Sequence, residues 1–250
     1  MIPIRDLNPT RSTPWATWTV LVVCGLVYLW QAVLPDGASR DFVFTWGMVP
    51  RRLTVVQDPQ AWLTVLTSMF MHGGFWHVLG NLWFLHVFGD NVEDNMGTAR
   101  FTGFYLLCGA FAALTQLLTN PASPVPMVGA SGAIAGVLAA YLVLFPRAQV
   151  VTLIPIFIFL HWMEIPAFVF IALWFVYQFF AGVTALGQSG GGVAYWAHIG
   201  GFVAGLALVW VFRRRRPPPV RVVFSPPRVG RAPWHDDRGW CTSLRSAHPT

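Results

Sequence analysis

Long apolar stretches without a single charged residue dominate the pattern of this chain. Asp, Glu, Lys and Arg are absent from residues 12–35, 59–89, 101–146 and 165–212. One helix needs roughly 20 apolar residues to cross a bilayer, so each of the two longest stretches can hold two crossings. Clusters of turn-forming residues at 120–126 and 187–192 divide these two stretches. The pattern predicts an all-α membrane protein with six transmembrane helices, at about 15–34, 70–89, 99–119, 129–145, 165–182 and 194–212.

Composition and charge agree with a membrane protein and indicate its orientation. Of the 250 residues, 55% are hydrophobic and only 10% are charged. The net charge of +6 does not indicate a nucleic-acid partner, because all basic residues are Arg and more than half of them lie at or beyond position 213. Basic residues concentrate on the cytoplasmic side of membrane proteins. With six crossings, one side would carry Arg5, Arg11, Arg100, Arg147 and Arg213 to Arg216, against Arg40, Arg51 and Arg52 on the other. We therefore expect both termini in the cytoplasm.

The helices and the charge pattern divide the chain into three parts. Residues 1–14 are expected to form a short polar cytoplasmic tail, 15–212 the six-helix domain, and 213–250 a disordered Arg/Pro-rich cytoplasmic tail. Residues 35–69 form a long first outer loop, predicted to be partly embedded in the membrane. Residues 148–163 are charge-free, broken by Pro155 and short for a crossing, so an interfacial or re-entrant segment is expected there.

The remaining sequence features limit the location and the cofactors. Cys24, Cys108 and Cys241 do not form a disulfide framework. The short N-terminal segment lacks a targeting presequence, which favours a bacterial plasma membrane. A His-Glu-x-x-His pattern is absent, and neither a metal nor another cofactor is expected. The lipid bilayer is the expected surrounding, and Arg213 to Arg216 suit anionic lipid. The pattern does not specify an oligomeric state.

Four polar side chains interrupt the apolar segments at matching depths. Ser131 and His198 each lie near the start of a helix that is predicted to run inward. His77 and Asn81 lie in the first half of another such helix, four residues apart and therefore on one face. Polar groups are costly in hydrocarbon, so each is a candidate for a functional site. The topology places all four in the outer half of the membrane.

Their chemistry points to nucleophilic hydrolysis. Serine needs a base to become a nucleophile, and His198 is the candidate base for Ser131. A Ser–His distance near 3 Å requires close approach of the two helices, which the small residues Gly129, Gly132, Gly201 and Gly205 would allow. His77 and Asn81 could stabilise an oxyanion, together with the Ser131 backbone N–H. The three helices contain no carboxylate near the site, so a dyad is predicted.

Each residue alone also has an ordinary explanation. Ser131 among small residues can serve helix packing, and His198 can pack or relay protons. His77 and Asn81 can link two helices by hydrogen bonds. Their shared depth favours a common hydrolytic site over these separate roles.

Taken together, four segments resemble the rhomboid intramembrane serine proteases. The segments are 67–81, 88–94, Gly129-Ala130-Ser131-Gly132 and Ala197-His198-Ile199-Gly200-Gly201, and the resemblance extends over about residues 15–212. It implies a six-helix rhomboid-like bundle, a Ser131–His198 dyad, an oxyanion site with His77 and Asn81, and cleavage of transmembrane protein substrates near their membrane entry. It also implies that the helix at 165–182 acts as a lateral gate beside the helix at 70–89.

One departure from the family concerns the base. Some members carry an aromatic residue four positions after the serine, which stacks on the histidine, whereas this chain has Ala135. What orients His198 is therefore open at this point. The alternative function is a catalytically inactive rhomboid-like protein that binds transmembrane clients. Such proteins lose the serine or the histidine, and this chain retains both.

Overall fold

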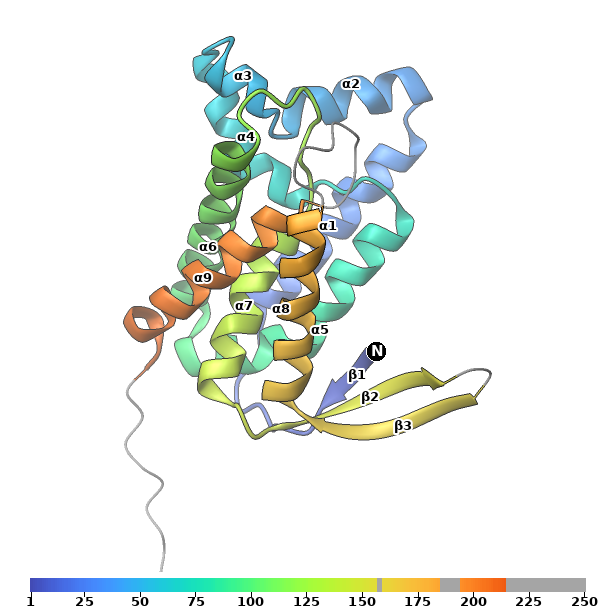
Figure 1. Ribbon diagram of the computed structural model, residues 1–250, viewed down its shortest axis with the longest axis vertical. Coiled ribbons are helices and arrows are strands. Elements are labelled where there is room, and N and C mark those ends of the chain that lie inside the picture. The colour runs from blue at the N-terminus through green and yellow to red at the C-terminus, as the bar shows by residue number, and fades with distance from the viewer. Residues whose placement is uncertain (157–158, 185–193, 215–250) are drawn as a thin grey trace, which may run out of the picture. The chain divides into compact units, whose positions relative to one another are not determined.

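The computed structural model describes residues 1–156, 159–184 and 194–214. These ranges are mostly helical and include one three-stranded sheet (Figure 1). In chain order, the elements are β1 (Ile2–Asp6), α1 (Trp15–Val33), α2 (Asp36–Trp46), α3 (Pro50–Thr54), the 3-10 helix η1 (Pro59–Leu63), α4 (Thr64–Thr67), the 3-10 helix η2 (Ser68–Phe70), α5 (Phe75–Met96), α6 (Thr98–Thr119), α7 (Ser131–Leu144), β2 (Gln149–Ile156), β3 (Phe159–Pro166), α8 (Ala167–Thr184) and α9 (Tyr195–Phe212). The predicted turn at 187–192 and the predicted disordered tail beyond Arg214 lie outside the described residues.

Four helices in the described ranges, α1, α6, α8 and α9, are long and apolar enough to cross a membrane. Their bounds agree with four of the predicted segments to within a couple of residues. The fifth segment, 129–145, corresponds to α7, which is apolar but shorter than a typical crossing. The sixth, 70–89, corresponds to α5, whose last turns are acidic. Length and composition thus identify a helical membrane protein with several crossings.

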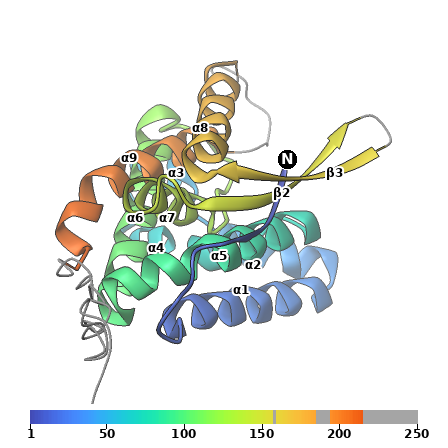
Figure 2. The same ribbon diagram turned by 90° about the horizontal axis from the view of Figure 1, so that it is seen from below.

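Helix α7 occupies the centre of the bundle. Every residue of α7 from Gly132 to Tyr141 is buried, and α5, α6, α8 and α9 all contact this helix (Figures 1 and 2). A helix that is surrounded on all sides needs no polar face. This position explains why the α7 sequence is apolar without a helical period, and it places the N-terminal end of α7, with Ser131, among four other helices.

The predicted end of the 70–89 helix is too early, because the acidic residues that follow continue α5 to Met96. The carboxylate of Glu93 accepts hydrogen bonds from the N–H groups of Ala16 (2.9 Å) and Thr17 (2.7 Å), and the Thr98 hydroxyl donates to it (2.8 Å). The first N–H groups of a helix lack partners within that helix. Glu93 therefore supplies partners to the start of α1, and this tertiary contact outweighs the turn preference of the local sequence.

The N-terminal residues are also not the expected polar tail. Residues Ile2–Asp6 form β1, which pairs antiparallel with β2, and β2 pairs antiparallel with β3. β-branched residues in β2 suit a pleated strand. The segment 148–163, expected to be interfacial or re-entrant, is thus mostly two strands, which leave the bundle between α7 and α8 (Figure 2).

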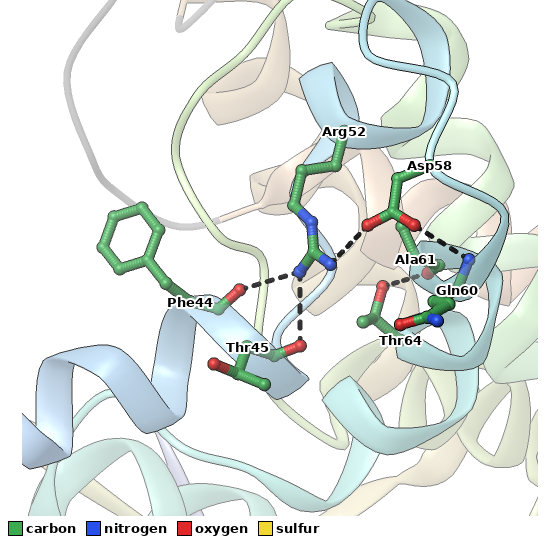
Figure 3. Close-up of polar contacts among 7 residues, drawn as sticks. All are labelled: Phe44, Thr45, Arg52, Asp58, Gln60, Ala61 and Thr64. Carbon is green, nitrogen blue, oxygen red and sulfur yellow. Dashed lines mark hydrogen bonds and ion pairs between the residues drawn. The ribbon is translucent and has the colours of Figure 1, made fainter.

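The segment 35–69, predicted to be a long and partly embedded loop, is folded into short helices. Arg52 joins two of its parts, since its guanidinium pairs with Asp58 (2.7 Å) and donates to the carbonyl oxygens of Phe44 (3.1 Å) and Thr45 (3.3 Å) (Figure 3). The hydrogen bond from Arg52 holds the pKa of the Asp58 carboxyl below its usual value. Asp58 also accepts from the Gln60 N–H (3.0 Å) and so begins η1.

Candidate active site

Ser131 is the first residue of α7, and the residue two positions before it must be glycine. Gly129 has φ of +131°, which side chains other than glycine rarely adopt. A Cβ on Gly129 would also stand only 2.8 Å from Nε2 of His77. The N–H of Gly129 donates to the carbonyl of Ser68 (2.9 Å), which holds this approach to α7 in place. The conformation of the backbone before α7 therefore requires glycine at position 129, and Ser131 lies at the wall of a cavity.

Helices α7 and α9 approach each other almost backbone to backbone. A Cβ on Gly201 would overlap the carbonyl oxygen of Gly132, and a Cβ on Gly205 would overlap that of Gly136. Small residues permit such contact between membrane helices. Three of the four glycines expected to pack near the site, Gly132, Gly201 and Gly205, thus lie at the α7–α9 contact, whereas Gly129 lies beside His77.

The close helix contact brings Ser131 and His198 within hydrogen-bonding distance. Oγ of Ser131 lies 2.7 Å from Nε2 of His198. On the other side of the ring, Nδ1 lies 2.7 Å from Oε1 of Gln178, which can only accept. Nδ1 therefore carries the proton, which leaves Nε2 as the acceptor for the Ser131 hydroxyl. This tautomer is the one that a general base needs.

The partner that orients His198 comes from α8, which the sequence interpretation treated mainly as a gate. Gln178 is buried, and Trp174, four residues earlier on the same helix face, places its ring 6.0 Å from the imidazole with planes at 34°. Ala135 is buried in the core, and the indole ring that lies against His198 comes from Trp174 of α8 instead of from position 135. Sequence reasoning missed both residues. A signal was present, because Gln178 is an amide within an apolar, aromatic helix.

His77 and Asn81 lie in the first two turns of α5. This helix begins at Phe75, later than predicted, after Gly74, whose backbone is extended. The Gly73 N–H donates to Nδ1 of His77 (3.4 Å), so Nε2 carries the ring proton. Nε2 is directed toward the Gly129 backbone, beside Ser131.

The side-chain amide of Asn81 carries an N–H₂ group that donates no hydrogen bond within the described part of the chain. Its side chain is 8% exposed, and Nδ2 has no hydrogen-bond partner among the described residues. Buried polar groups are normally paired. An unpaired amide N–H₂ at a cavity wall is therefore available to a bound group.

One cavity of about 810 Å³ joins these side chains. Its walls include residues of α5, α7, α8, α9 and the segment before α7, among them His77, Asn81, Ser131, Gln178 and His198. The four polar residues predicted from sequence thus line one cavity, together with Gln178 and Trp174. In the ranges that the structure describes, no three His, Cys, Asp or Glu side chains lie close enough together to share a metal ion.

Comparison with known proteins identifies the family. A family model described as Rhomboid domain matches residues 59–215. Rhomboid protein 1, mitochondrial, of Saccharomyces cerevisiae is 30% identical over 152 residues, which cover 59% of this chain and 41% of the yeast protein. Rhomboid-like protein 11, chloroplastic, of Arabidopsis thaliana is 30% identical over 132 residues, 53% of this chain and 42% of the plant protein.

Another relative shows that membership does not by itself imply activity. Inactive rhomboid protein 1 of Drosophila melanogaster is 31% identical over 116 residues, 46% of this chain and 7% of the fly protein. The chain thus spans less than half the length of each of these three relatives. The family includes serine proteases as well as inactive members. Because the family model covers more than half of its residues, the chain belongs to the rhomboid family.

Proposed function

We propose that the chain is an intramembrane serine endopeptidase that cleaves transmembrane protein substrates near the outer membrane face, through an acyl-enzyme on Ser131. One observation carries the proposal: Ser131, His198 and Gln178 form a continuous line of hydrogen bonds, each 2.7 Å long, at the wall of a cavity. A purely structural serine and histidine would not need a third side chain that selects the base-competent tautomer.

The first step is attack by Ser131 on the scissile carbonyl carbon. As the Oγ–C bond forms, the hydroxyl proton moves to Nε2 of His198, which becomes an imidazolium. Its Nδ1–H remains bonded to Oε1 of Gln178, and hydrogen bonds that involve a charged group are stronger than neutral ones. Gln178 therefore stabilises the charged base more than the neutral one, which lowers the barrier.

The carbonyl oxygen becomes an oxyanion in the same step and needs fixed donors. Asn81 and His77 line the same cavity as Ser131. The unpaired Nδ2 of Asn81 and the Nε2–H group of His77, which lies near the Gly129 backbone, can act as donors. The Ser131 N–H belongs to the first turn of α7, where no partner within the helix exists. These three groups are the proposed oxyanion donors.

The intermediate then collapses, and the peptide C–N bond breaks as His198 gives its proton to the leaving amine. A water molecule, deprotonated by His198, attacks the acyl-enzyme carbonyl and releases Ser131 and the new carboxylate. Because the N–H and C=O groups of a helical peptide bond are engaged within the helix, we expect substrates whose helix unwinds easily near the outer face.

The topology proposed for this function has six crossings, in which α5 and α7 complete the set formed by α1, α6, α8 and α9. Both termini then lie on one side, and the distribution of Arg residues favours the cytoplasm. We place the protein in a bacterial plasma membrane, with residues 15–212 as the protease domain. A partly embedded outer loop at 35–69 and a lateral gate beside α8 belong to the same proposal.

The alternative function is that of an inactive family member which binds transmembrane clients. The similarity to the Drosophila relative, which is named as inactive, supports this alternative. The serine–histidine pair argues against it, since a client-binding protein needs no hydrogen-bonded nucleophile and base.

A fluorophosphonate probe separates the two functions without knowledge of the substrate. The purified protein in detergent is labelled beside the variants Ser131→Ala, His198→Ala and Ser39→Ala, the last of which removes a serine of α2 outside the cavity. We expect labelling of wild type and Ser39→Ala only. If folded wild-type protein is not labelled, or if Ser131→Ala is labelled equally, the protease proposal is wrong and the client-binding function is favoured.

A further inference from the structure

The hairpin β2–β3 carries a group of large apolar side chains that the protein itself leaves uncovered. Phe159, Leu160, Trp162 and Met163 are 65%, 63%, 63% and 48% exposed. The base of the hairpin is different, because Val150 is fully buried and Ile165 packs against the main core. The outer half of the hairpin is therefore a projecting apolar element, which the proposed catalytic reaction does not use.

Both faces of this outer half carry large apolar side chains. Side chains alternate between the two faces of a strand, so Phe159 and Met163 lie on one face of β3, and Leu160 and Trp162 on the other. The register adds apolar partners to the second face, since Leu160 pairs with Pro155 and Trp162 with Leu153. On the far side of β2, Leu153 also pairs with Ile2 of β1, which is 48% exposed. The polar side chains of β3 are His161, between Phe159 and Met163 on the first face, and Glu164, nearer the base on the second. A water-exposed sheet normally has one polar face, whereas here large apolar side chains occupy both faces.

The position of the hairpin indicates what covers these residues. The chain passes directly from Pro166 of β3 into α8, one of the helices that can cross a membrane. The apolar surface continues along α8 through exposed residues such as Phe168 and Leu173. The hairpin extends crosswise to the helices, at the end of the bundle where α7 ends and α8 begins (Figure 1). Its apolar surface is thus continuous with the lipid-facing surface of the bundle.

The free edge of β3 limits how deep the hairpin can lie. In the described ranges, β3 is an outer strand of the sheet, with β2 as its neighbour on one side. Unpaired backbone groups cost several kcal/mol each in hydrocarbon, but they find partners among water and headgroups at the interface. Aromatic residues such as Trp162 favour the same depth. Exposed Arg5 and Arg147 near the base complement anionic headgroups.

We propose that the outer half of the β2–β3 hairpin, with Ile2 of β1, lies in the bilayer interface on the side of the N-terminus, where its apolar side chains contact lipid acyl chains. The occupant of this surface is lipid rather than a protein partner, because the hairpin leads directly into a helix that can cross a membrane and carries large exposed apolar side chains on both faces. The hairpin then ties the end of α7 and the start of α8 to one leaflet. This inference does not depend on catalytic activity.

Spin labels measure the depth of the hairpin directly. Phe159→Cys and Trp162→Cys are labelled in separate samples of the full chain, reconstituted in vesicles of phosphatidylcholine and phosphatidylglycerol. Cys24 and Cys108 are buried, so only Cys241 is first replaced by Ser. Val22→Cys on the exposed face of α1 gives the lipid reference, and Ala122→Cys in the turn between α6 and α7 gives the aqueous reference. Collisions with oxygen, which concentrates in lipid, are compared with collisions with a water-soluble nickel chelate.

We expect both hairpin labels to collide more often with oxygen than with the nickel chelate, with a ratio between those of the two references. A ratio equal to that at Ala122 would place the hairpin in water and overturn the proposal. Low collision rates with both reagents would mean that protein covers the hairpin, and they would overturn it as well. Catalytic inactivity of the protein would leave these readings unchanged, so failure of the proposed function and failure of this inference are distinguishable.

Discussion

The substitution Gln178→Met tests how much of the proposed catalysis depends on the tautomer of His198. Met matches the length of Gln and offers no amide acceptor, so the ring N–H at Nδ1 loses its partner. Gln178 and His198 are only 6% and 8% exposed, so bulk water cannot readily replace the lost contact. The imidazole can then carry its proton on Nε2, in which case the Ser131 hydroxyl faces a donor and loses its base.

The size of the effect follows from the 2.7 Å hydrogen bond between Gln178 and His198. A hydrogen bond to a charged group contributes about 1.5–3 kcal/mol, and each 1.36 kcal/mol changes a rate tenfold, so the rate should fall about 10- to 150-fold. The bond acts on the charged base formed in the transition state. The loss should therefore appear in kcat, while KM for a transmembrane substrate stays near its wild-type value.

Two assays and one matched control isolate this effect. The rate of fluorophosphonate labelling reports the nucleophile without any substrate, and steady-state cleavage of a single-span substrate separates kcat from KM. Gln31→Met is the control, since Gln31 is also a buried glutamine and makes two hydrogen bonds of 3.2 Å to the backbone of His72. It should lower thermal stability without changing the rate of labelling of folded protein.

The proposed role of Gln178 would be refuted by Gln178→Met protein that labels at the wild-type rate. It would also be refuted if both substitutions slowed labelling equally, since the effect would then reflect general stability. Partial recovery in Gln178→Asn, which restores an acceptor on a shorter stem, would support an orienting role.

Three further predictions concern packing, anchoring and pH. Gly201→Ala should destabilise the fold by about 1–3 kcal/mol or more, because its Cβ overlaps the Gly132 carbonyl, whereas Gly25→Ala, with open space around it, should leave the melting temperature in detergent nearly unchanged. Glu93→Gln replaces one of the oxygens that accept from the Ala16 and Thr17 N–H groups with a donor, and should cost about 1–3 kcal/mol of stability, while Glu164→Gln on exposed β3 should cost almost nothing; equal melting temperatures of these two variants would contradict the anchoring role. Burial, reinforced by the charge of Asp90 and opposed by the hydrogen bond from Tyr141, raises the pKa of Asp6 to about 6. Because the folded protein then binds the proton more tightly than the unfolded chain, the contribution of Asp6 to stability is fully present below its usual pKa of 3.8 and is lost as the pH rises through about 6. Hydrogen exchange of the β1–β2 amides, corrected for intrinsic rates, should show weaker protection at pH 7.5 than at pH 5, and Asp6→Asn should remove this difference.

The sequence by itself determined the helices that can cross the membrane and the side chains that gather at the cavity. Helices α1, α6, α8 and α9 were predictable because the length of an apolar stretch is a local property, matched to the thickness of hydrocarbon. Ser131, His198, His77 and Asn81 were predictable as a group because a polar residue in an apolar helix is conspicuous and because topology sets its depth.

Only the tertiary structure decided which group orients the base and which polar residues hold the ends of the helices. Gln178 lies in an aromatic helix, and the sequence of that helix does not indicate a hydrogen-bond partner for its amide. The hydrogen bond to His198 forms because α8 packs against α9 with the face of Gln178 toward His198. The local sequence around Glu93 is typical of a turn, but the residue is helical and its carboxylate contacts the start of α1. The apolar segment that forms β2 and β3 has the composition of a membrane segment, but β2 also pairs with β1 from the other end of the chain, with Ile2 opposite Leu153. In each case the deciding contact joins residues far apart in the chain, and local patterns carry no information about such contacts.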